Sequence, residues 1–116
     1  MEISWQKCAG DVWGSLLGVN LRHPHFDNLE GIYIIWQANG PVIRVGQGII
    51  RDRLSAHRLD PEVTAYDPLH VTWAPVSLFH RNGVEKYLAN TLKPKVGEAF
   101  PDAIPMAVVL PWPWIG

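Results

Sequence analysis

The chain has 116 residues, enough for one compact domain with a modest core and too few for a separate DNA-binding domain. Ten lysines and arginines against eleven aspartates and glutamates give a net charge of −1. A chain without net positive charge does not hold duplex DNA through its overall charge. The single cysteine, Cys8, excludes an internal disulfide and argues against a zinc cluster. Without a leader-like start or a run of about 18 apolar residues, we expect a cytoplasmic protein that does not enter a membrane.

The first 29 residues are expected to form a segment that packs against a sheet. Trp5, Trp13 and an apolar run at residues 15–21 favour an extension that covers an otherwise open sheet face. The His23-Pro24-His25 sequence is interpreted first as a turn, because proline punctuates it. A metal site there is a distant second possibility, since no cysteine and no acidic residue except Asp27 is near.

Two β-prone runs flank an asparagine-glycine pair at 39–40, which predicts a hairpin with a two-residue type I′ turn. This turn places Tyr33 opposite Gly46 and Ile35 opposite Arg44. Tyr33 and Arg44 are then diagonal neighbours, and Gly46 leaves space opposite the phenol ring. The shared face is expected to carry Tyr33, Ile35, Gln37, Val42, Arg44 and Gly46.

A helix is predicted from about residue 48 to 59, ended by the Asp-Pro pair at 60–61. At 100° per residue, Ile50, Leu54 and His57 share the core-facing stripe, and Arg53 lies on its edge one turn before His57. A guanidinium and an imidazole beside the core suggest a phosphate site. The structural alternative is an ion pair for Arg53 and a satisfied core histidine for His57. Arg51 and Arg58 are expected to point toward solvent.

Three further elements follow. Residues 70–77 predict a third strand, which Pro75 ends or places at an edge, and residues 106–110 suggest a further short strand. Residues 82–97 predict a second helix with Glu85 at the border of its inner stripe of Val84, Leu88, Thr91 and Leu92. Asn82 and Glu85 also have the spacing of a capping box, so Glu85 has a local alternative role at its own helix end.

GIY at 31–33, VG at 45–46, RLSAH at 53–57 and the helix that carries Glu85 together resemble the GIY-YIG nuclease family. The resemblance implies an α/β (α+β) domain over residues 1–116, with a small, mainly antiparallel three-stranded sheet flanked by helices. Its core would span residues 30–100, with residues 1–29 and 101–116 as extensions outside the family pattern.

The implied activity is metal-dependent endonucleolytic hydrolysis of phosphodiester bonds in DNA. Glu85 would hold Mg²⁺ or Mn²⁺, and Arg53 would neutralise charge on the phosphoryl oxygens. Tyr33 would orient or deprotonate the attacking water, His57 would accept its proton or bind the phosphate, and Arg44 would assist the phenol.

Two positions depart from the family pattern. Arg44 stands where the second tyrosine is expected, and Val96 and Gly97 stand where a late asparagine is expected; Gln47 could supply an amide instead. A non-catalytic nucleic-acid-binding or protein-interaction module is therefore the alternative function.

Clustered cations and a tryptophan-rich tail suggest partners. A basic rim that binds nucleic acid and a solvated charged face are equally compatible with the positions of Arg51, Arg58, Lys86, Lys93 and Lys95. Trp112 and Trp114 either fold onto the core or meet a homo-oligomer or another protein partner.

Overall fold

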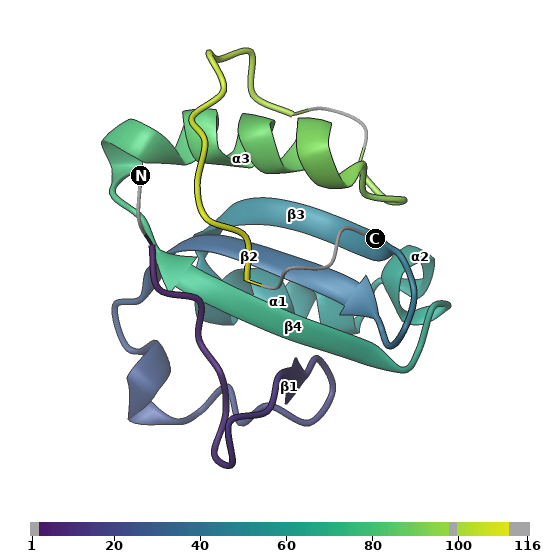
Figure 1. The fold of residues 1–116 in the computed structure, drawn as a ribbon. Coiled ribbons are helices and arrows are strands. Elements are labelled where there is room, and N and C mark those ends of the chain that lie inside the picture. Colours follow the sequence, from purple (N-terminus) through teal and green to yellow (C-terminus); the bar gives the residue numbers. More distant parts are fainter. Residues whose placement is uncertain (1–2, 98–99, 112–116) are drawn as a thin grey trace.

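The protein is an α+β fold in which helices flank one antiparallel sheet. The computed structural model describes residues 3–97 and 100–111 (Figure 1). Its elements are β1 (Gly14–Ser15), the 3₁₀ helix η1 (Pro24–Phe26), β2 (Glu30–Gln37), β3 (Val42–Ile49), α1 (Ile50–Arg58), α2 (Pro61–Thr64), β4 (Leu69–Pro75) and α3 (Leu78–Leu92). No helix within these residues is both long and apolar enough to cross a lipid bilayer.

The sheet has four strands in the order β1-β4-β2-β3, and every neighbouring pair is antiparallel. The expectation of three strands was wrong because the extension before residue 30 supplies the short strand β1, in which Gly14 pairs with Val71 of β4. β4 consequently lies inside the sheet, and Pro75 ends it, as predicted. β3 is left at the sheet edge, next to β2 alone within the sheet.

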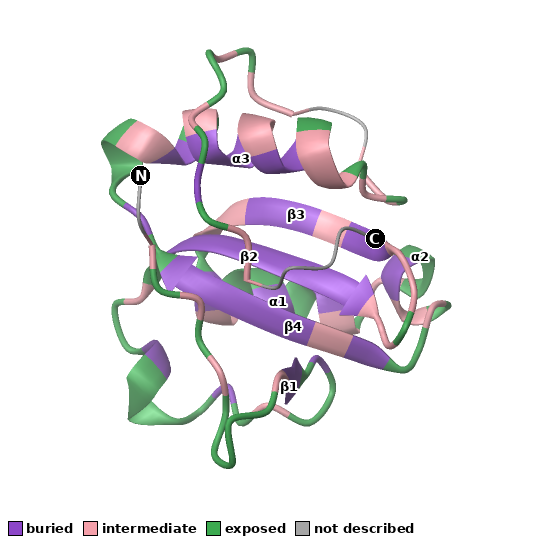
Figure 2. Cartoon of the chain, in the orientation of Figure 1, coloured by how far each residue is buried: buried purple, intermediate pink, exposed green. Residues whose placement is uncertain are grey.

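Helices cover both faces of the sheet, with α3 on one side and α1 and α2 on the other (Figure 1). Ile32 and Ile34 of β2 pack beneath Val84 and Leu88 of α3. The alternate residues of β2, Tyr33 and Ile35, pack with α1. Burial is concentrated in β2, β3, β4 and the side of α3 toward the sheet (Figure 2). Because both faces of β2 are covered, its sequence is almost continuously apolar instead of alternating.

The β2–β3 hairpin has the predicted pairing but not the predicted turn. Tyr33 lies opposite Gly46 and Ile35 opposite Arg44, as expected. The register then shifts, so that Trp36 pairs with Val42 and the connection takes three residues, 38–40, with Asn39 at φ 58°. Val42 therefore packs on the α3 face, not on the Tyr33 face as predicted. A β-bulge adds one residue to β3, and it compensates for the longer loop.

The other boundaries differ modestly from those expected. α1 begins at Ile50, and its buried residues are the predicted Ile50, Leu54 and His57. α3 runs from Leu78 to Leu92, so it starts four residues before the predicted position and stops where Lys93 takes a left-handed conformation. Residues 106–110 form no strand, although Met106 donates a backbone hydrogen bond to Gly83 of α3. The HPH sequence, predicted as a turn, caps and begins the 3₁₀ helix η1, and His25 Nε2 accepts a hydrogen bond from Trp73 Nε1.

Candidate active site at the edge of β3

Tyr33 of β2 and His57 of α1 form a buried hydrogen-bonded pair between the sheet and the helix. The phenol oxygen lies 2.6 Å from His57 Nε2, and the two residues are only 1% and 5% exposed. A side chain at position 46 would collide with the phenol, because a Cβ there would overlap the Tyr33 hydroxyl. Gly46 of β3 therefore leaves the space in which the Tyr33 side chain extends to His57 of α1.

His57 is a neutral imidazole at physiological pH. Burial is the main reason that its pKa falls from the ordinary value of 6.5 to about 4, and the charges of Arg44 and Arg53 lower it further. A neutral ring with its proton on Nδ1 accepts a hydrogen bond from the phenol at Nε2. The phenol therefore has a neutral acceptor 2.6 Å away within the core.

Arg44 carries a positive charge with a buried, unpaired donor. Its Nε atom is buried and has no hydrogen-bond partner among the described residues. Its terminal Nη1 lies against Gly97, where a Cβ would come within 2.5 Å, and Gly97 has a φ of 116°, which favours glycine. A buried guanidinium donor without an acceptor is costly, so an anion at this position would relieve the deficit.

Arg53 projects from the first turns of α1 and is exposed. Its aliphatic carbons Cγ and Cδ pack over Gly48, which has a φ of 134° and closes the β3–α1 junction without a side chain. Within the described residues its guanidinium makes no hydrogen bond and no ion pair, so the structural ion pair considered for Arg53 is absent there. Its charge acts on both His57 and Glu85.

Glu85 reaches the same edge from the opposite face of the sheet. It is 7% exposed, and burial raises the pKa of its carboxyl, while a hydrogen bond from Gln47 and the charges of Arg44 and Arg53 oppose that rise. The capping-box alternative was wrong, because α3 has its N-cap at Ser77 and Asn82 lies inside the helix. Glu85 is therefore held beside β3 by contacts outside its own helix end.

Gln47 is the residue that links β3 to α3. Its Nε2 donates to Asn82 Oδ1 at 2.8 Å, and its side chain also hydrogen-bonds Glu85. From the sequence, Gln47 was considered as a source of an amide only because it follows the VG pair. Its contact with Asn82 was not predicted. Their contact joins residues 35 positions apart, which helical or strand periodicity does not reveal.

Both arginines counted in the basic rim, and a further arginine, Arg81, are engaged within the protein. The prediction that Arg51 and Arg58 point toward solvent was wrong. Arg51 donates hydrogen bonds to the Leu21 and His23 carbonyls and to the Asp27 carboxylate. Arg58 bonds the carbonyls of Leu16 and Val19. Arg81 is buried and bonds the Val76 carbonyl and Glu30.

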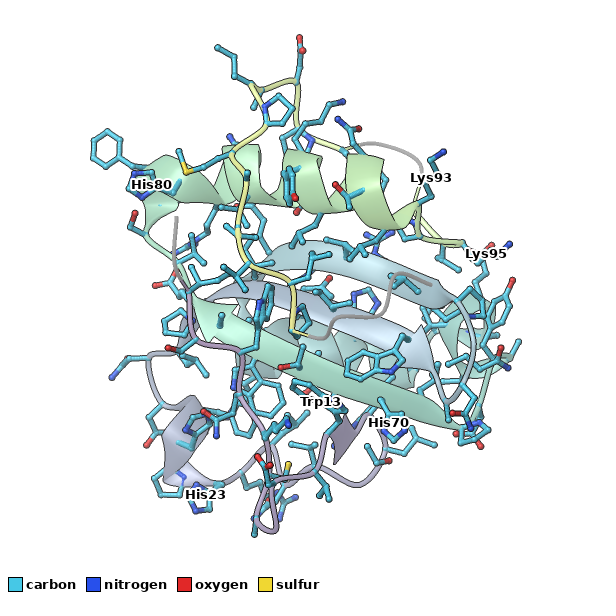
Figure 3. The ribbon with its side chains drawn as sticks, in the orientation of Figure 1. Trp13, His23, His70, His80, Lys93 and Lys95 are labelled. Carbon is cyan, nitrogen blue, oxygen red and sulfur yellow. The ribbon has the colours of Figure 1, made fainter. Side chains whose placement is uncertain are left out.

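The remaining cations of the rim are lysines. Lys93 and Lys95 are exposed and lie beyond the C-terminal end of α3, on the side of α2 (Figure 3). Lys86 follows Glu85 on α3 and is half-buried. Trp112 and Trp114, for which core packing and a partner surface were both considered, lie outside the described residues.

The donor set at this edge suits one kind of metal ion. Within residues 3–97 and 100–111, no three histidine, cysteine, aspartate or glutamate side chains gather closely enough to hold a metal. Glu85 would be the protein ligand that the resemblance implies. Mg²⁺ is commonly bound by one or two carboxylates, with water and substrate phosphate as its other ligands, so a single carboxylate fits this ion.

Comparison with known proteins adds no relative to these observations. No protein-family model, no curated protein and no solved structure matches the chain. The functional interpretation therefore depends on the residues themselves.

Proposed function

We propose that this protein is a metal-dependent nuclease of the GIY-YIG type, which hydrolyses phosphodiester bonds in DNA. The observation that carries the proposal is the position of five side chains around β3. Tyr33, His57 and Arg53 approach from the α1 face, Arg44 lies on β3 itself, and Glu85 approaches from the α3 face.

The two arginines would bind and polarise the scissile phosphate. Arg44 has a buried donor without a partner, and Arg53 has a solvent-facing guanidinium. Guanidinium groups match phosphate oxygens with paired hydrogen bonds, which strengthen as charge accumulates in the transition state. Phosphate binding would also offset the positive charge that lowers the His57 pKa.

Tyr33 and His57 would activate the water nucleophile. A phenol with a pKa near ~10 is a poor base while protonated, so the tyrosine must pass its proton on before it can accept one. His57, 2.6 Å away, would be the acceptor once a bound phosphate offsets the charges of Arg44 and Arg53 that disfavour a proton on its ring. Glu85 would hold Mg²⁺ or Mn²⁺, which supplies Lewis-acid stabilisation of the leaving oxygen.

Arg44 replaces a second phenol without leaving the site incomplete. It lies opposite Ile35, diagonal to Tyr33, and supplies a cation next to the reacting groups. Gln47 supplies the amide that orders the Glu85 carboxylate, a role that the missing late asparagine does not fill. On this proposal, Arg44 and Gln47 would take the places of the second tyrosine and the late asparagine.

Cleavage of labelled duplex, flap, fork and single-stranded DNAs tests the proposal. We expect cutting with Mg²⁺ or Mn²⁺ that stops with chelator and falls by on the order of 10²-fold or more in Glu85→Gln and Arg53→Ala proteins. Asp52→Asn, which neutralises an exposed carboxylate on α1, is the matched control and should cut normally. Equal cutting by all four proteins would indicate a contaminating nuclease.

The same experiment separates the nuclease from the binding module. No cutting by well-folded wild-type protein on any substrate, together with metal-independent DNA binding, would replace the proposal with the non-catalytic alternative.

A further inference from the structure

A hollow lies next to Arg44, one of the proposed catalytic residues. It has a volume of about 490 Å³ and lies between α2 and the segment that follows α3. The residues that line it are Glu62, Ala65, Tyr66, Lys95, Val96 and Gly97. This volume is within the usual range for a small-molecule or nucleotide pocket.

One wall of this hollow is shared with Arg44. Gly97 lines the hollow and also lies against Arg44 Nη1. The segment is held there by β3, because Val96 donates a backbone hydrogen bond to the Ile43 carbonyl at 2.8 Å and Lys95 donates one to Val42 at 3.2 Å. A group bound in the hollow would therefore lie next to a phosphate bound by Arg44.

The opposite wall is formed by α2 and Tyr66, which follow closely in the chain after His57. The N-cap of α2, Asp60, donates its backbone N–H to the His57 carbonyl, and α2 leads directly to Tyr66. The Tyr66 ring packs against the core cluster on the α1 face and is half-buried. Its hydroxyl makes no hydrogen bond with the part of the chain that is described, so its position is set by packing.

The side chains of the hollow match a nucleobase better than a second phosphate. Tyr66 offers an aromatic ring, on which any base can stack. Glu62 is exposed at the rim, and its carboxylate repels phosphate but accepts hydrogen bonds from the exocyclic amino groups of bases. Lys95, exposed at the other side, can reach the phosphate of the adjoining nucleotide.

We propose that this hollow receives the base of an unpaired nucleotide beside the phosphate held by Arg44. A base inside a duplex is stacked on both sides, so the site would select single-stranded or splayed DNA over continuous duplex. The net charge of −1 agrees with such a choice, because little long-range attraction to a duplex is available. This inference rests on the proposed function for the position of the phosphate.

Binding without cleavage gives the direct test. A short single-stranded oligonucleotide that contains 2-aminopurine is titrated with protein in chelator, and quenching of the fluorescent base reports stacking. We expect quenching with wild-type protein and with Tyr66→Phe, which keeps the ring. Tyr66→Leu should lose the quenching and bind roughly 5- to 100-fold more weakly.

Stability and cleavage measurements keep the outcomes distinct. Circular dichroism and thermal melting of Tyr66→Leu show whether its fold is retained, and Lys95→Ala, a surface change, should weaken binding without abolishing quenching. Absence of quenching with wild-type protein, or equal quenching in Tyr66→Leu, overturns the base site even if DNA is cut. Quenching that depends on Tyr66 without any cutting supports the base site and removes the nuclease.

Discussion

At the scale of single residues, the proposed site places the neutral imidazole of His57 beside two arginines. His57 is buried, hydrogen-bonded to Tyr33 and close to Arg44 and Arg53, so a proton on its ring is doubly unfavourable. The same cations oppose the effect of burial on Glu85 and favour its ionised form. Burial, with a smaller contribution from the two guanidinium groups, thus keeps the imidazole uncharged, and the same groups assist the carboxylate in staying charged.

The depressed pKa of His57 predicts loss of stability in mild acid. The unfolded chain takes up this proton near pH 6.5, whereas the folded protein resists it down to about pH 4. The free energy of unfolding should therefore fall as the pH decreases through this window, by about 3 kcal/mol in total from His57. Urea unfolding at several pH values measures it.

A His57→Gln protein is the control for this effect, because glutamine does not titrate. Its free energy of unfolding should change less between pH 6.5 and 4 than that of wild type. Identical pH profiles of the two proteins would contradict the neutral buried imidazole.

The Gln47 amide predicts a positioning effect on Glu85. Gln47→Leu keeps the size of the side chain but removes both hydrogen bonds, to Asn82 and to Glu85. We expect a higher Mg²⁺ concentration for half-maximal cleavage and a loss of roughly 10- to 100-fold in kcat/KM. Gln37→Leu, at the far end of β2, is the matched control, and an equal loss there would argue against a specific role.

The family resemblance selected the residues of the proposed site, and local periodicity predicted where most of them lie in the fold. Strand alternation put Tyr33 and Arg44 on one face, and helical spacing put His57 inside and Arg53 at the border. The same reasoning failed for Arg51 and Arg58, whose partners lie in the segment from Leu16 to Asp27. A helical wheel does not show which distant part of the chain returns to cover an exposed face.

At the scale of elements, α1 has two uses for its arginines. Arg51 and Arg58 fasten the N-terminal segment to the helix through backbone carbonyls, and Arg53, on another side, stays without such a partner. Hydrogen bonds from charged donors to backbone carbonyls contribute typically about 1.5–3 kcal/mol each. One helix therefore holds the extension on one side and faces the proposed site on another.

This division predicts opposite phenotypes for neighbouring arginines. Arg51→Ala should lower the free energy of unfolding by roughly 1–3 kcal/mol and leave cleavage by the folded protein nearly unchanged. Arg53→Ala should leave stability nearly unchanged and remove cleavage. Thermal melting and single-turnover rates of both proteins measure the two effects, and similar behaviour of the pair would refute the division.

The hairpin shows how far pattern reasoning extends to elements. The pairing of Tyr33 with Gly46 was predicted from a two-residue turn, yet the loop has three residues. The predicted register survives because the bulge near Ile43 offsets the extra loop residue. Bulges depend on packing across the whole sheet, which explains why Val42 was assigned to the wrong face.

At the scale of the whole molecule, few cations remain for nucleic acid. With Arg51, Arg58 and Arg81 engaged internally, the cations on the side of the proposed site are Arg44, Arg53, Lys86, Lys93 and Lys95. Composition showed the neutral total, but only the fold shows which charges are available.

This arrangement limits the salt dependence of DNA binding. If these five cations all contact phosphates, the plot of log affinity against log salt for single strands has a slope no steeper than about −3.5. Lys95→Ala should make the slope shallower by about 0.7. Fluorescence polarisation over a range of KCl concentrations measures both, and a slope beyond about −5 would require the internally bonded arginines to contact DNA as well.

The edge position of β3 has a consequence for assembly. Beyond residues 42 and 43, which pair with residues 95 and 96, the outer backbone of β3 has no neighbouring strand among the described residues. Such an edge is where another chain would add a strand. On the proposed function, a strand added there would run along the edge where Arg44 lies, between the face that carries Arg53 and the face that carries Glu85, and would cover the position proposed for the phosphate. Substrate and an edge-pairing copy of the chain would then compete, so an active oligomer would join through a different surface.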